Sequence, residues 1–184
     1  MRLDGNTWRS SFSVDDGESN VIDAQHSVLT VFSGSTGSGG HASMFLERIE
    51  SGKPKCYLID LTEGGGVISI AKSAAQIIKG DNSVINMSLP KGGDPLKLSA
   101  AHRHSYAIDA ERTEAVILAV DRFKKKAAAG RYVYRVTGGA LGRMTSRYGT
   151  RGINCADFVI KILREAGIKK VAYLLFDTPF RVAK

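Results

Sequence analysis

The chain has 184 residues, which is long enough for one domain with a substantial core and too short for two comfortable ones. Its composition is 43% hydrophobic and 24% charged, which excludes a disordered or fibrous protein. The formal net charge of +8 favours polyanionic partners such as nucleic acid, acidic glycans or anionic lipid heads, and a positive surface that only maintains solubility explains it equally well.

The first residues, MRLDGNTWRSSFSVDDGESN, lack the apolar core of a secretory signal, and no apolar run approaches the roughly 20 residues that span a bilayer. We therefore expect a protein without a transmembrane segment that is made in the cytoplasm. If it acts outside its cell, a specialised secretion system exports it, and a cytosolic enzyme fits the same observation. Two cysteines, Cys56 and Cys155, are too few for a disulfide framework. No metal-ligand spacing is present, and we expect no cofactor.

The N-terminal half begins with a polar segment. Residues 1–25 are rich in Gly, Ser and Asp without a sustained period, which predicts a loose lead-in or a partly ordered arm ahead of a single catalytic domain at 26–184. The run HSVLTVFSG predicts a strand, and SGSTGSGG after it predicts a flexible loop. That loop lacks the Lys-Ser/Thr ending of a phosphate-binding loop.

Two strand-like runs, HASMFLERI and CYLIDLT, are joined by ESGKPK, which suits a hairpin. Side chains alternate along a strand, so His41 shares a face with Ser43, and Asp60 shares a face with Thr62. A turn near residues 51 and 52 sets Ser43 opposite Asp60 and makes His41 a diagonal neighbour of Asp60. The hairpin is therefore predicted to bring an imidazole and a carboxylate together.

Helical periodicity is clear in two later segments. An Asp109 cap precedes apolar residues at helical spacing and a helix end in KKKAAAG, whose lysines complement the negative pole of the helix. After a strand in RYVYRVTGG and a Gly/Arg-rich loop, a final helix carries one apolar stripe and stops at Gly167. The stripe consists of Cys155, Phe158, Val159, Ile162, Leu163 and Ala166. VAYLLFDTPFRVA predicts a last strand.

Cys155 opens that final helix. The first N–H groups of a helix have no internal partners and carry the positive end of its dipole, so they favour a thiolate and can receive the oxyanion that forms when a carbonyl is attacked. A histidine would then transfer the proton and a carboxylate or amide would orient it. A free cysteine on an apolar stripe is, however, usually a small buried hydrophobe. His102 and His104 are surface residues or substitutes for His41.

In chain order, GHASMFLE, YLIDL, a helix before YVYRV, and NCADFVIKILREAGI resemble the circularly permuted branch of the NlpC-type papain-like cysteine hydrolases. In that group Gly-His opens one strand, a polar residue lies on the next, and the Asn-Cys helix comes last. The resemblance spans roughly residues 38 to 168. It implies an α+β fold in which an antiparallel sheet packs against the helix that carries the nucleophilic cysteine at its N-terminus.

The resemblance also implies roles for particular residues. Cys155 would be the nucleophile, His41 the general base and acid, and Asp60 the orienting group, although relatives vary at this third position and Ser43 or Thr62 are alternatives. Substrate contacts are expected from Asn154, which also suits a helix cap, and from Arg151, Tyr132 and Tyr134. We expect strand alternation to turn one of the two tyrosines to the cleft and the other to the core. Arg143 and Arg147 would flank the cleft.

Three functions fit these observations. The first is a peptidoglycan stem-peptide endopeptidase or amidase that acts as an antibacterial type VI secretion effector, with an immunity protein or secretion carrier as its partner. The second keeps the thiol chemistry and changes the target, as in permuted acyltransferases and in hydrolases of lipids or proteins. The third is a basic nucleic-acid-binding module without catalysis, in which affinity rests on phosphate contacts. The first two need no nucleic acid.

Overall fold

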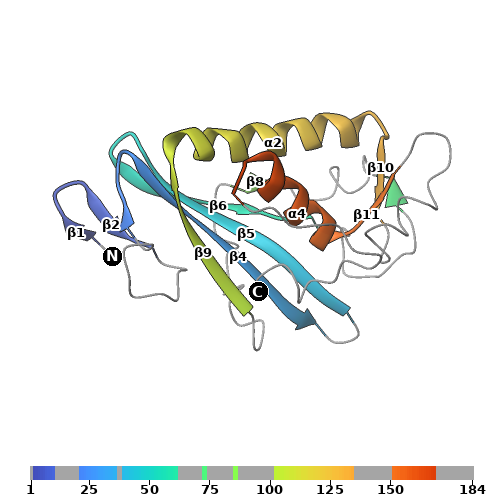
Figure 1. Ribbon diagram of the computed structural model, residues 1–184, viewed down its shortest axis with the longest axis horizontal. Helices are drawn as coiled ribbons and strands as arrows, with labels where there is room; N and C mark the ends of the chain where they lie inside the picture. The colour runs from blue at the N-terminus through green and yellow to red at the C-terminus, as the bar shows by residue number, and fades with distance from the viewer. Residues whose placement is uncertain are drawn as a thin grey trace.

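The computed structural model describes residues 2–10, 21–36, 39–61, 72–73, 85–86, 102–134 and 151–168. Its described part has an α+β architecture in which antiparallel sheet is packed against two helices (Figure 1). The main sheet has five strands in the order β8-β6-β5-β4-β9. These strands are β4 (His26–Thr36), β5 (Gly39–Glu50), β6 (Lys53–Ile59), β8 (Ile85–Asn86) and β9 (His102–Asp109).

The hairpin of β5 and β6 has the predicted register. Its turn lies at Ser51 and Gly52, which both have positive φ, and the ladder runs from Glu50↔Lys53 to Met44↔Ile59. The ladder ends one pair before the predicted pairing of Ser43 with Asp60, which stays a prediction. The neighbouring segment SGSTGSGG differs from the prediction, because β4 continues to Thr36 and β5 starts at Gly39. Its Gly, Ser and Thr residues pair as strand over most of the expected loop.

Helices α2 (Ala110–Ala128) and α4 (Cys155–Glu165) cover one face of the main sheet, where they lie side by side in Figure 1. Both contribute to one core with alternate residues of the central strands, as expected for period-two alternation. We call this the helix side. Its buried residues include Leu29 and Val31 of β4, Ala42, Met44 and Leu46 of β5, Val116, Val120 and Phe123 of α2, and Phe158, Val159 and Ile162 of α4.

The opposite face of the sheet is buried as well. Phe32 and Phe45 stack there with ring centroids 5.6 Å apart, and the hydroxyls of Thr30 and Ser105 are 3.0 Å apart. Glu47 is 5% exposed and accepts a hydrogen bond from Ser10. Two-sided burial explains why β4 and β5 are rich in apolar and small residues on both of their faces.

The N-terminal segment contains three short strands that were not predicted from the sequence. Strands β1 (Arg2–Asp4), β2 (Thr7–Arg9) and β3 (Val21–Ile22) form a three-stranded antiparallel sheet. Ile22 is 1% exposed, and β3 contacts β4 and β5. The strands are too short to show a period in the sequence, so the prediction missed them.

A third sheet lies at the end of the molecule where α2 stops (Figure 1). It pairs β7 (Lys72–Ser73), β10 (Tyr132–Tyr134) and β11 (Arg151–Ile153) in the order β11-β10-β7. Strands β10 and β11 run parallel, and β11 leads directly into α4. This pairing therefore ties the start of α4 to the chain that follows α2.

Helix α2 begins as the sequence predicts. The side chain of Asp109 caps it by accepting a hydrogen bond from the Arg112 N–H at 2.8 Å, and Lys125 and Lys126 lie in its last turn. No helix in the described part of the chain is both long enough and apolar enough to cross a membrane.

Candidate active site

Cys155 is the first residue of α4, as predicted from the sequence. Asn154 precedes it in an extended conformation, and its side-chain oxygen accepts a hydrogen bond from the Asp157 N–H at 2.8 Å. The Asp157 carboxylate in turn accepts one from the Asn154 N–H at 3.2 Å. This reciprocal capping box fixes the entry to the helix, so the Asn154 side chain has the structural role that the sequence allowed.

The surroundings of Cys155 are tightly packed. Its side chain is 2% exposed, and it makes no hydrogen bond or ion pair with the described residues. One turn further along α4, Phe158 meets Phe123 of α2 edge-on, with centroids 4.6 Å apart. The first two turns of α4 are buried all round, where the sequence predicted a single apolar stripe, because α2 packs on one side and β5 on another.

His41 and Asp60 take register positions on the side of the sheet opposite α4. His41 pairs with Gly34 in an unbroken ladder and has the parity of Ser43 and Phe45, whereas Ala42 and Met44 belong to the helix-side core. Asp60 is half-buried and lies between Ile59 and Leu61, which both belong to the helix-side core. By strand alternation, the positions of His41 and Asp60 therefore belong to the same face of the sheet, and this is not the face that contacts α4. The side chain of His41 lies outside the described part of the structure.

A different histidine occupies the helix side. His104 of β9 is exposed and meets Tyr106 edge-on, with ring centroids 4.5 Å apart, and Tyr106 packs against the helix-side core. Within the described residues, the buried oxygens Tyr106 Oη and Ser33 Oγ have no hydrogen-bond partner. The alternation of His104, Tyr106 and Ile108 is visible in the sequence. Alternation alone does not say which face the helices cover, so the sequence did not place His104 relative to them.

Of the predicted substrate contacts, Tyr132 lies in the core. It is 6% exposed and stacks on Phe123 with centroids 4.7 Å apart. The prediction that alternation turns Tyr132 and Tyr134 to different faces was wrong, since residues two apart on a strand share a face. Arg151 of β11 pairs with Tyr132 of β10. The side chains of Arg151 and Tyr134 lie outside the described part of the structure. The same holds for Thr62, Arg143, Arg147, the side chain of His102 and the predicted last strand.

Sequence reasoning also missed a buried polar group on the opposite face. Cys56 of β6 faces Glu47 of β5 in the ladder, and burial together with the negative charge of Glu47 raises the pKa of the Cys56 thiol to about 12. Both cysteines are free. Inward-facing Glu47 could have been found from its parity with Ser43 and Phe45.

The described residues contain no group of three or more His, Cys, Asp or Glu side chains arranged to hold a metal ion. No protein-family model matches the chain, and comparisons with curated proteins and with solved structures give no match either.

Proposed function

We propose that the protein is a thiol hydrolase that cleaves an amide bond, with Cys155 as its nucleophile and a permuted NlpC-type, papain-like arrangement of its elements. One observation carries the proposal: Cys155 is the first residue of a helix that begins with a capping box. Cys155 lies at the positive end of the helix dipole, and the first-turn N–H groups suit an oxyanion.

In the proposed reaction the Cys155 thiolate attacks the carbonyl carbon and forms a C–S bond. The tetrahedral oxyanion collapses, the C–N bond breaks, and the protonated imidazole gives its proton to the leaving amine. Water then attacks the thioester, with the imidazole as general base, and releases the carboxylic acid and the thiolate. With Asp60 as its orienting group, His41 is the imidazole that the sequence favours.

The helix side offers a second candidate for the imidazole. By strand alternation, His104 lies on the same face of the sheet as the residues that pack toward the helices, whereas the position of His41 lies on the other face. Replacing each histidine by alanine separates the two assignments, because only the general base is needed for both half-reactions. Loss of hydrolysis in His41→Ala with retention in His104→Ala supports the triad with Asp60, and the reverse result assigns the role to His104.

For the substrate we propose a peptidoglycan stem peptide, cleaved by a type VI effector with its own immunity protein, and acyl transfer or lipid and protein hydrolysis as the alternative. Incubation with purified sacculi tests this choice, since released muropeptides support wall cleavage. If the wild-type protein hydrolyses a thiol-reactive ester substrate but releases no muropeptides, the target is a lipid or a protein.

The test of the chemistry itself is Cys155→Ala, compared with Cys56→Ala. We expect the first to abolish hydrolysis and the second to leave it unchanged, with both proteins folded by circular dichroism. Hydrolysis that survives Cys155→Ala would refute the thiol mechanism.

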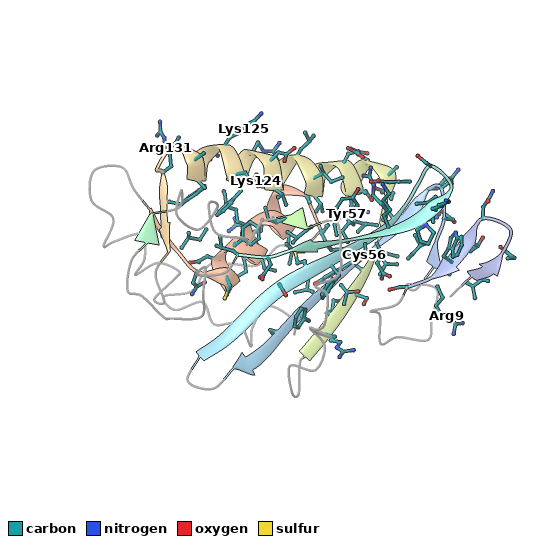
Figure 2. All side chains as sticks on the ribbon, turned by 180° about the vertical axis from the view of Figure 1, so that it is seen from behind. Arg9, Cys56, Tyr57, Lys124, Lys125 and Arg131 are labelled. Carbon is teal, nitrogen blue, oxygen red and sulfur yellow. The ribbon has the colours of Figure 1, made fainter. Side chains whose placement is uncertain are left out.

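A second candidate function, binding of nucleic acid, is favoured by a basic cluster at the end of α2. Lys124, Lys125, Lys126 and Arg131 form no ion pair with the described residues, and all but Lys124 are exposed. Figure 2 shows Lys125 and Arg131 pointing away from the body of the molecule. Phosphate contacts weaken steeply with salt, so binding to duplex DNA that persists in Cys155→Ala and disappears at high salt would support this function.

A further inference from the structure

A small cavity of about 160 Å³ lies at the end of the sheet where α2 begins. It is bounded by the chain just before and at the start of β4, by the end of β5 and by the first turn of α2. Its polar lining comes from Asp23, Gln25, Ser27, Arg48, Thr113 and Glu114. At roughly 30 Å³ per water, this volume corresponds to about five water molecules, so it suits a ligand of only a few heavy atoms.

Ser27 gives the cavity a polar floor. It pairs with Ile108 of β9 in the ladder, and its side chain is 6% exposed. Within the described residues, its hydroxyl has no hydrogen-bond partner. A hydroxyl can donate one hydrogen bond and accept others, so Ser27 can bind a polar occupant of the cavity.

Arg48 supplies a fixed cation beside Ser27. Its Nε donates to Glu50 at 2.7 Å and its Nη1 donates to Glu114 at 2.9 Å. Burial lowers the pKa of Arg48, but the hydrogen bond to Glu114 and the charge of Glu50 outweigh this and raise it. The remaining nitrogen, Nη2, makes no hydrogen bond to the described residues. The guanidinium is therefore charged, held in place, and able to donate to a carboxylate.

Two carboxylates on the cavity wall have the opposite charge. Asp23 accepts hydrogen bonds from the N–H groups of Gln25 and His26, both at 2.7 Å. Glu114 uses Oε1 for Arg48, while its Oε2 makes no hydrogen bond to the described residues. The lining thus offers anionic acceptors and a cationic fork within one small space, which matches a ligand that carries both charges.

We propose that this cavity binds the head group of a small zwitterionic α-amino acid. Its carboxylate accepts from Ser27 Oγ and Arg48 Nη2, and its ammonium donates to Asp23 and Glu114. Arg48 lies seven positions along β5 from His41, or roughly 23 Å at the rise of a strand. The cavity lining includes no residue of α4, so the site is separate from Cys155 and does not depend on the hydrolase proposal.

Calorimetric titration of the full chain with alanine tests the site, with ethylamine and propionate as analogues that each lack one charge. We expect half-saturation by alanine at about millimolar concentration and at least roughly tenfold weaker binding of either analogue. Amide shifts at Ser27 and Arg48 in NMR spectra should locate the ligand in the cavity.

Variants complete the test. Ser27→Ala should weaken alanine binding by about tenfold, and Arg48→Lys should weaken it further because lysine lacks the fork. Glu111→Gln, an exposed change on the same first turn outside the cavity, should bind as wild type. The proposal is overturned if alanine does not bind, if either analogue binds as tightly, or if Ser27→Ala leaves binding unchanged.

Discussion

The two cysteines of this protein lie in contrasting regions. Cys56 lies within β6 beside Tyr57 (Figure 2), directly across from the buried carboxylate of Glu47. Cys155 lies at the first position of α4, behind an asparagine cap. Cys155 is the more deeply buried of the two, so the proposed nucleophile is the less exposed thiol.

The electrostatic surroundings differ more than the burial does. A negative charge opposite Cys56 disfavours its thiolate, which is the form that acts as a nucleophile, and the pKa of about 12 follows from burial and from this charge. Cys155 instead lies at the N-terminus of α4, which is the positive end of the helix dipole. Backbone position is therefore the basis on which Cys155, and not Cys56, is proposed as the nucleophile.

The largest expected effect is a difference between the alkylation rates of the two cysteines. With iodoacetamide at pH 8, we expect Cys155 to be alkylated faster than Cys56, because burial and the charge of Glu47 raise the pKa of Cys56 to about 12 and keep that thiol protonated. Peptide mapping by mass spectrometry gives the two rates, and Cys155→Ala and Cys56→Ala assign them. Faster labelling of Cys56 would reverse the comparison and remove the nucleophile from the proposed function.

The next effect tests how firmly α4 is held. Phe158→Ala removes a fully buried ring that contacts Phe123 and should lower the free energy of unfolding by about 3–5 kcal/mol. Arg164→Ala, an exposed change on the same helix, is the control and should cost within about 0.5 kcal/mol. Urea denaturation measures both, and equal effects would show that α4 does not pack as described.

A smaller effect is expected at the helix cap. Asn154→Ala removes the acceptor for the Asp157 N–H and should cost about 1 kcal/mol. Asn154→Asp keeps an acceptor and should retain most of that stability. If Asn154 also supports the reaction, the loss of activity in Asn154→Ala will exceed what unfolding explains at the assay temperature, whereas a purely structural cap predicts matched losses.

The parts of the fold that could be predicted are those that local sequence patterns determine. The hairpin of β5 and β6, the Asp109 cap and the start of α4 rest on local patterns, namely turn residues, caps and periods of two or 3.6. The N-terminal sheet has strands too short for a period. The separation of His41 from the residues facing α4 depends on which sheet face the helix covers, and that is a tertiary choice that parity alone leaves open.

The same limit explains why His104 and Glu47 were overlooked. Each has a side-chain direction that is fixed by strand alternation, yet only the packing of α2 and α4 tells which direction faces the helices. Once that is known, Tyr106 and Ile108 identify His104 as a helix-side residue, and Phe45 identifies Glu47 as a residue of the opposite face.

The smallest expected effect tests whether the charge of Glu47 contributes to the raised pKa of Cys56. Glu47→Gln removes the negative charge and should lower the pKa of Cys56 from about 12 only part of the way to its ordinary value of about 8.5, since burial, the larger cause, remains. A raised pKa keeps the folded thiol protonated while the unfolded thiol ionises, so Cys56 disfavours folding increasingly as the pH rises from about 8.5 towards 12. Urea denaturation between pH 8 and 11 should show a shallower loss of stability for Glu47→Gln than for wild type, each measured against its own Cys56→Ala variant. Identical pH slopes would mean that burial alone keeps Cys56 protonated.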